Sequence, residues 1–132
     1  MTIFRKCIFF GVLFAGAFIG ELFSQNAGFQ RTVVEKSDVS VAGREAVITH
    51  VEINPGVSVG RHTHPGEEIS YIIEGSGELL IEGQPPRKLK AGDGFVVPAG
   101  AKHDARNTGT TVLKLAAIYV VEKGKPLATP AP

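Results

Sequence analysis

The sixteen residues from Gly60 to Gly75, GRHTHPGEEISYIIEG, combine metal-ligand chemistry with the beginning of a β-strand. His62, His64 and Glu68 fall within seven residues, and a run rich in β-branched and aromatic residues follows. Side chains two positions apart on a strand project to the same side, so the two imidazoles face one way. Glu68 comes after a short Pro-Gly turn, which predicts that its carboxylate returns beside them at the start of the next strand.

A third histidine stands further along the chain in a similar setting. The segment PAGAKHDARN, from Pro98 to Asn107, places His103 just past a turn and at the head of another predicted strand. Three imidazoles and one carboxylate suit a divalent transition metal such as Fe, Mn, Ni, Cu, Co or Zn. A six-coordinate ion would keep two positions open. The pair His62 and His64 alone would equally fit two surface histidines, but the combined spacing favours a metal site.

The rest of the chain reads as short β-strands. From Arg31 onward, β-like runs alternate with Gly, Pro, Asn and Asp clusters at intervals of roughly ten residues. In Glu45 to Ile53 the hydrophobic residues alternate, and no sustained helical periodicity appears after Gln30. This pattern predicts an all-β jelly roll over residues 28–122. The Pro-rich segment 123–132 is expected to be a frayed tail.

Length and composition are those of one globular domain. The chain has 132 residues, of which 43% are hydrophobic and 20% charged. Its net charge is close to zero and no basic patch stands out, which argues against a nucleic-acid partner.

The first 27 residues resemble a secretory signal peptide. Arg5 and Lys6 precede a fourteen-residue apolar run, Cys7 to Gly20, which is shorter than the about 20 residues of a membrane span. We expect cleavage near residues 24–27 and export to the periplasm or the extracellular space, and an uncleaved membrane anchor is the alternative. The mature chain would lack cysteine, and therefore disulfides, because Cys7 is the only one. It would need no membrane partner.

Two motifs in the chain resemble those of the cupin superfamily, G(X)5HXH(X)3–4E(X)6G and G(X)5PXG(X)2H(X)3N. The ten fixed positions that match are Gly56, His62, His64, Glu68, Gly75, Gly92, Pro98, Gly100, His103 and Asn107. Each position has a background frequency of roughly one in twenty, so coincidence is a poor explanation. The resemblance implies a double-stranded β-helix that holds a metal inside the barrel through His62, His64, Glu68 and His103.

Several other polar residues are candidates for a place in or near the metal site. Tyr119 shares a strand face with Leu115 and Ala117, predicted to line the barrel, and is the one candidate for a catalytic side chain. We interpret Arg61 as an ion-pair residue and His50 as a surface or supporting residue. Glu67 and Tyr71 project opposite to Glu68, and Asn107 is expected to hydrogen-bond at the barrel edge rather than bind the metal.

The predicted function is that of an exported metal-binding cupin whose open metal positions take a small organic molecule. Members of this superfamily include oxygenases, isomerases and non-enzymatic binders, so the alternative is a module in which the metal only anchors a ligand. The resemblance also implies a homodimer. It would form by packing of exposed strand faces that carry Ile69, Tyr71 and Ile73, or by exchange of the N-terminal strand, FQRTVVEKSDV.

Overall fold

The structure, a computed structural model, describes residues 27–132, and all regular secondary structure in that range is β. No helix long and apolar enough to cross a membrane occurs within the described range. The predicted signal peptide lies outside these residues except for Ala27. The strands are β1 (Phe29–Asp38), β2 (Arg44–Ile53), β3 (His62–Thr63), β4 (Gly66–Glu74), β5 (Ser76–Ile81), β6 (Arg87–Lys90), β7 (Gly94–Val97), β8 (His103–Arg106), β9 (Leu113–Glu122) and β10 (Thr129–Pro130).

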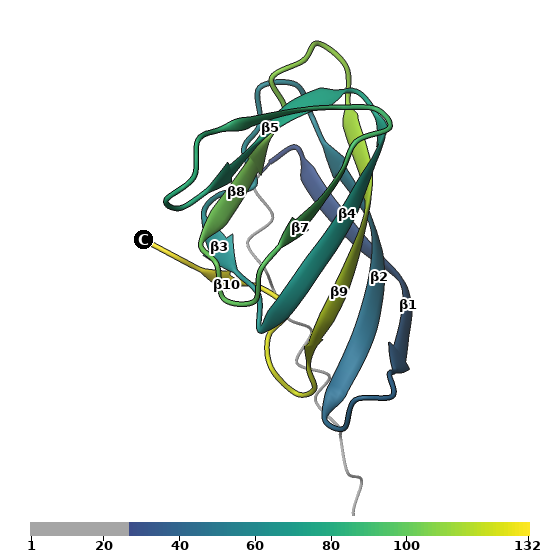
Figure 1. The fold of residues 1–132 in the computed structure, drawn as a ribbon. Helices are drawn as coiled ribbons and strands as arrows, with labels where there is room; N and C mark the ends of the chain where they lie inside the picture. Colours follow the sequence, from purple (N-terminus) through teal and green to yellow (C-terminus); the bar gives the residue numbers. More distant parts are fainter. Residues whose placement is uncertain (1–26) are drawn as a thin grey trace, which may run out of the picture.

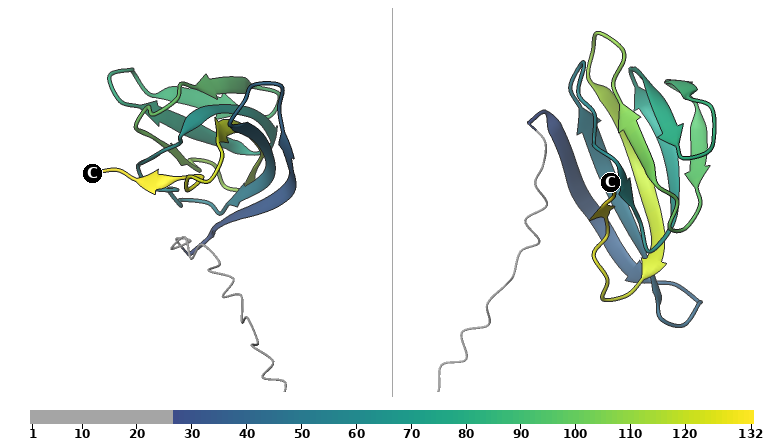
Figure 2. Two further views of the ribbon diagram at one scale, coloured as in Figure 1. Left: turned by 90° about the horizontal axis from the view of Figure 1, so that it is seen from below. Right: turned by 90° about the vertical axis from the view of Figure 1, so that its left-hand side faces the viewer.

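The strands form two five-stranded sheets that face each other and roll around a common interior (Figures 1 and 2). One sheet has the order β1-β2-β9-β4-β7 and the other the order β10-β3-β8-β5-β6. Neighbouring strands are antiparallel, and strands distant in sequence, such as β2 and β9, lie side by side over their full length. The predicted double-stranded β-helix is confirmed.

The core follows from strict alternation along the long strands. In β9 every second residue is buried, from Leu113 to Val121, and β2 buries Val47, Thr49, Val51 and Ile53 in the same way. Because β2 and β9 pair along their whole length, these side chains point together into the barrel. Burial of this apolar face, at about 25 cal/mol per Å² removed from water, is the main force that closes the two sheets.

The inner face of β4 differs from that of its neighbours. Its inward positions are Gly66, Glu68, Ser70 and Ile72, so the face begins polar and ends apolar. The barrel therefore contains a polar cluster at one place and a hydrocarbon core beside it. Glu68 is a buried charged side chain on this face, and its partners reach it across the interior of the barrel.

The C-terminal segment differs from the prediction of a frayed tail. Thr129 and Pro130 pair with Thr63 and His62 of β3, and Ala128 is buried. The prediction failed because proline is compatible with an edge strand. Pro130 lies on such a strand, where its lack of an N–H removes no hydrogen bond between strands. Residues 125–131 thus complete the second sheet. They bring a backbone carbonyl to the polar cluster.

Candidate metal centre

The two sheets bring all four predicted ligands to one point inside the barrel. His62 on β3 lies directly opposite His103 on β8, and His64 directly follows β3. Glu68 enters from β4 in the facing sheet, and all four residues are buried. One potential ligand atom from each of them lies within 4.8 Å of all the others. That separation is the span of a single coordination sphere.

The three imidazoles contact one another and the carboxylate. Their ring centroids are 4.2 Å apart for His62 and His103, 4.8 Å for His62 and His64, and 5.0 Å for His64 and His103. Oε2 of Glu68 lies 3.0 Å from Nε2 of His64 and 3.2 Å from Nε2 of His103. The cluster is therefore compact and asymmetric, with the carboxylate closest to two of the three rings.

Backbone carbonyls hold the outward nitrogen of every ring. Nδ1 of His62 lies 2.7 Å from the Gly60 carbonyl and Nδ1 of His103 lies 2.9 Å from that of Ala101. Nδ1 of His64 lies 2.6 Å from the Leu127 carbonyl in the C-terminal segment. A carbonyl only accepts, so each Nδ1 carries a proton, and a neutral ring in this tautomer presents an Nε2 lone pair inward. Partners of this kind orient metal-bound histidines.

This tautomer makes the cluster unfavourable without a cation. If the rings are neutral with the proton on Nδ1, Nε2 of His64 and His103 and Oε2 of Glu68 are all acceptors, yet they lie within hydrogen-bond distance. Acceptors at such distances attract only if a proton or a metal ion lies between them. A set of three imidazole nitrogens and one carboxylate oxygen is a good N/O donor set for a first-row transition metal. The residues present therefore fit a metal ion.

Glu68 is held as a carboxylate. Burial alone would raise its pKa, but the hydrogen bonds that His103 and His64 donate when Nε2 carries a proton, together with the one from Ser70, outweigh burial and hold the pKa well below its ordinary value. Oε1 accepts a hydrogen bond of 2.7 Å from the hydroxyl of Ser70, its inward neighbour on β4. Ser70 thus fixes the plane of the carboxylate and leaves Oε2 for the cluster.

His62 is held neutral. Burial, and then the neighbouring His103, lower its pKa from the ordinary 6.5 to about 3. A neutral imidazole is the form that binds a metal, so its lone pair is available at neutral pH.

Tyr119 lies against the cluster, inside the barrel. It is directly opposite Glu68 in the β4–β9 pairing, its side chain is 1% exposed, and its ring centroid is 4.6 Å from that of His64. Burial, and then the charge of Glu68, raise the pKa of the phenol above its ordinary value. Tyr119 is therefore a hydrogen-bond donor at neutral pH, not a phenolate.

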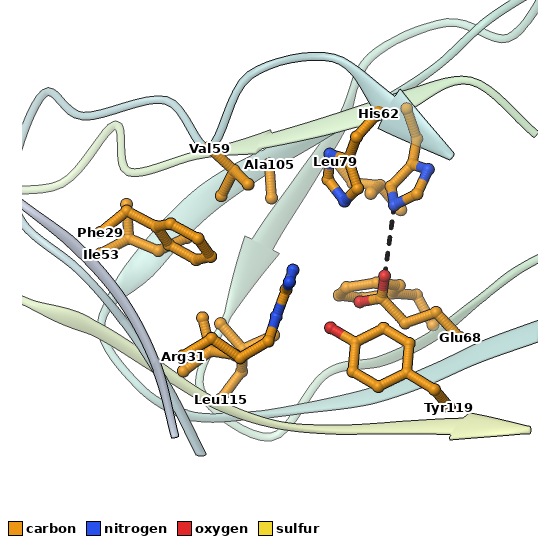
Figure 3. Close-up of a pocket in the computed structure, with 13 residues that line it drawn as sticks. Phe29, Arg31, Ile53, Val59, His62, Glu68, Leu79, Ala105, Leu115 and Tyr119 are labelled. Carbon is orange, nitrogen blue, oxygen red and sulfur yellow. Dashed lines mark hydrogen bonds and ion pairs between the residues drawn. The ribbon is translucent and has the colours of Figure 1, made fainter. Parts of the chain in front are cut away.

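A cavity opens beside the cluster, and one of its lining residues was not foreseen. This narrow cavity, which is partly open to solvent, is bordered by His62, Glu68, His103, Tyr119 and a wall of apolar side chains. Arg31 of β1 also lines it (Figure 3). The alternation of FQR indicates that Phe29 and Arg31 share a face, but not that this face is the inner one.

The residues set aside in the sequence lie away from the cluster. Arg61 is exposed and pairs with Glu82 at 2.7 Å, as predicted. Glu67 and Tyr71 are exposed on the outer face, and His50 is half-buried on the face of β2 that points away from the core.

Asn107 is buried outside the cluster, in a turn. Its amide donates to the carbonyls of Ile53 and Thr111 and its Oδ1 accepts from the Gly109 amide. Asn107 thus closes a turn, as expected.

Comparison with known proteins identifies the family. The family model described as "Cupin domain" matches residues 49–121. An oxalate-binding protein of Thermotoga maritima is 34% identical over 86 residues, which cover 64% of this chain and 70% of that protein. This chain belongs to the cupin family.

Two further relatives bear on the site and the fold. Dimethylsulfoniopropionate lyase DddQ of Ruegeria pomeroyi is 49% identical over 45 residues, which cover 34% of this chain and 22% of the lyase. The aligned segments span about half of several other curated relatives. A double-stranded β-helix protein of Klebsiella pneumoniae has a similar structure, with a TM-score of 0.65, 23% identity and coverage of 80% of this chain and 88% of that chain.

Proposed function

We propose that this cupin binds one divalent transition-metal ion and uses it to hold a small organic molecule in the barrel cavity. The ligands would be Nε2 of His62, His64 and His103 and the carboxylate of Glu68. One observation carries the proposal: three imidazoles with Nδ1 fixed on backbone carbonyls turn their Nε2 atoms toward one buried carboxylate.

The cavity favours catalysis over simple binding. When bound, the ion supplies Lewis acidity and, if it is iron or copper, redox chemistry. The chain adds Tyr119, a protonated phenol that lines the same cavity and can donate a hydrogen bond or a proton to a bound molecule. The apolar wall would reduce the contact of the bound molecule with water. We propose an isomerase, lyase or oxygenase on this basis.

A non-enzymatic binding module is the second candidate. It is favoured by a relative of which the alignment covers 70%, and which is named as an oxalate-binding protein. In this reading the metal only anchors a ligand and Tyr119 only orients it.

We also propose that the protein is exported. The basic pair Arg5 and Lys6 and the apolar run Cys7 to Gly20 that follows it support this. N-terminal sequencing of the protein expressed in its full length tests the proposal: a mature chain that begins near residues 25–28 supports it. Recovery of an intact N-terminus in the membrane fraction would point to the anchor instead.

The experiment that tests metal binding is elemental analysis of the purified protein and of His62→Ala/His64→Ala. We expect about one metal ion per chain in the wild type and loss of stoichiometric binding in the double variant. His50→Ala, which removes a histidine outside the cluster, should keep full occupancy. Circular dichroism would verify that each variant keeps its β fold. Full occupancy in the double variant would overturn the ligand assignment.

Measurements on the loaded protein separate the two candidates. The metal that analysis finds would be loaded to full occupancy, and dioxygen uptake would be screened with small organic acids. Turnover that is lost in Tyr119→Phe supports the enzyme. Ligand binding without turnover, unchanged by Tyr119→Phe, supports the binding module.

A further inference from the structure

The Arg31 guanidinium is the feature of the cavity that metal binding leaves unexplained. Arg31 is the only Lys or Arg among the described residues that line the cavity. Its side chain extends from β1 into the middle of the cavity, on the side of the Tyr119 hydroxyl and facing His62 (Figure 3). A long cationic side chain in an otherwise largely apolar wall calls for a reason.

Two aromatic rings hold the Arg31 guanidinium in place, but one of its hydrogen-bond donors has no acceptor. Its guanidinium carbon lies 5.3 Å from the ring centroid of Phe29 and 5.5 Å from that of Tyr119, so the two rings hold it from the sides. Its Nε is buried and has no hydrogen-bond partner. Buried donors are nearly always satisfied in folded proteins, so an unsatisfied Nε beside a cavity indicates an acceptor that enters from it.

The nearest carboxylate does not fill this role. Glu68 lines the same cavity, but Oε1 is bound by Ser70 and Oε2 by His64 and His103. Arg31 takes part in none of the ion pairs formed among residues 27–132. The guanidinium is therefore positively charged, half-buried and without a carboxylate of its own.

Charge then selects the ligand. A divalent ion, the Arg31 cation and the Glu68 anion would leave the cavity with an excess of positive charge, because imidazoles that bind a metal are neutral. A molecule that enters such a site is favoured if it is an anion. A guanidinium presents its N–H groups as a planar fork that matches a carboxylate, and the paired hydrogen bonds are among the stronger ones in proteins.

We propose that Arg31 is the carboxylate-binding residue of this site and that the ligand is a small carboxylic acid. This inference rests on the proposed function, because the ligand is the molecule that the metal centre receives. The small cavity limits the size of the ligand, and its apolar wall leaves Arg31 and Tyr119 as the polar contacts outside the metal cluster.

Calorimetric titration of the metal-loaded protein with acetate, oxalate and malonate tests the inference, with acetamide, oxamide and malonamide as uncharged controls. We expect at least one of the acids to bind and its amide to bind much more weakly. Arg31→Met should weaken the binding of the acid by about ten- to a hundredfold, the equivalent of one charge-assisted paired contact. Arg31→Lys keeps the charge without the fork and should fall between. Arg61→Met removes a surface arginine and should bind as the wild type does.

Metal content, measured in every variant after titration, separates the two hypotheses. Unchanged metal occupancy with no preference for acid over amide, or with equal affinity in Arg31→Met, overturns the role of Arg31 and leaves the metal centre standing. Absence of metal with acid binding that still depends on Arg31 overturns the metal centre and leaves the carboxylate site. If Arg31→Met fails to fold, Arg31→Lys and the acid–amide comparison decide the matter.

Discussion

At the scale of single residues, the site depends as much on what holds the ligands as on the ligands themselves. Each histidine donates from Nδ1 to a carbonyl and Glu68 is bound by Ser70, so no ring is free to rotate. Such partners reduce the entropy lost when a metal binds. The cost is a cluster of buried polar groups that no apolar core would tolerate alone.

Gly66 is a position near Glu68 at which the backbone of β9 leaves no room for a side chain. A Cβ at Gly66 would lie 2.0 Å from the Val120 carbonyl oxygen and 2.7 Å from the Val121 Cα, both backbone atoms of β9. Only glycine lets β4 approach β9 here, two residues before Glu68. We predict that Gly66→Ala lowers the free energy of unfolding by about 3 kcal/mol or more and displaces Glu68.

Chemical denaturation checks this prediction, with Gly94→Ala as the matched control. At Gly94 the nearest atom to a new Cβ would be 3.4 Å away, so this strand glycine should change stability by less than about 0.5 kcal/mol. Equal stability of the two variants would mean that β4 and β9 can separate at no cost.

At the scale of elements, the C-terminal segment is the least expected contributor to the site. Leu127 supplies the carbonyl that orients His64, and β10 pairs with β3 at His62 and Thr63. The Ala131 amide also donates to the Arg61 carbonyl. Two of the four candidate ligands are therefore supported by residues that follow the last long strand.

We predict that deletion of residues 125–132 weakens metal binding by about ten- to a hundredfold, because His64 loses its Nδ1 acceptor. Competition with a chromophoric chelator measures the change. Lys125→Ala, which removes only an ion pair with Glu122, is the control and should keep the wild-type affinity. A truncated protein with unchanged affinity would show that the segment covers the barrel without supporting the ligand.

At the scale of the whole molecule, the outer face of one sheet carries a continuous apolar row. The row crosses β2, β9, β4 and β7 through residues that are paired from strand to strand: Ile48, Ile118, Ile69 and Val96. Ile69, Tyr71 and Val96 are 44%, 53% and 58% exposed. We propose this row as the surface of a homodimer, with exchange of β1, which pairs with β2 in the single chain, as the alternative.

Light scattering of residues 28–132 at micromolar concentration tests the dimer. We expect twice the monomer mass for the wild type and monomer mass for Tyr71→Arg, which places a charge beside the row. Lys88→Glu changes the charge on β6, in the other sheet, and should leave the dimer intact. A wild-type monomer that persists on concentration would contradict the proposed homodimer.

Acid should destabilise the metal-free protein as a whole. Folding lowers the pKa of His62 from 6.5 to about 3. Between these two values the unfolded chain binds a proton at His62 that the folded chain does not bind, so acid favours the unfolded state. The pKa of Glu68 is also lowered, and its contribution is present above its unfolded value of 4.5 and lost as pH falls further. Both groups act in the same direction.

We predict that the free energy of unfolding decreases steadily from pH 7 to pH 4 in the presence of a chelator. Urea denaturation at each pH measures it. His62→Gln should show a smaller slope between pH 6.5 and 4.5, whereas His50→Gln should keep the wild-type slope. A flat profile would contradict the neutral, buried state of His62.

The pattern of residue types along the chain was enough to predict the β class, the alternating core of β2 and β9, and the four residues of the candidate metal site. These depend on periodicity and on donor chemistry, which neighbouring residues carry: His62 and His64 must share a side, and Glu68 must follow a turn. The two motif spacings added the double-stranded β-helix. The outward direction of Ile69, Tyr71 and Ile73 follows from the same alternation.

Only the tertiary structure decided which distant groups complete the site. Arg31 and Leu127 lie 31 and 63 residues from His62 and His64 in sequence, and no local pattern marks either as a neighbour of the cluster. The role of Leu127 is carried by a backbone carbonyl, which every residue has, so its side chain bears no signal. Arg31 reaches the cavity because β1 adds to the edge of β2, and that pairing is set by the closure of the whole sheet rather than by the strand itself.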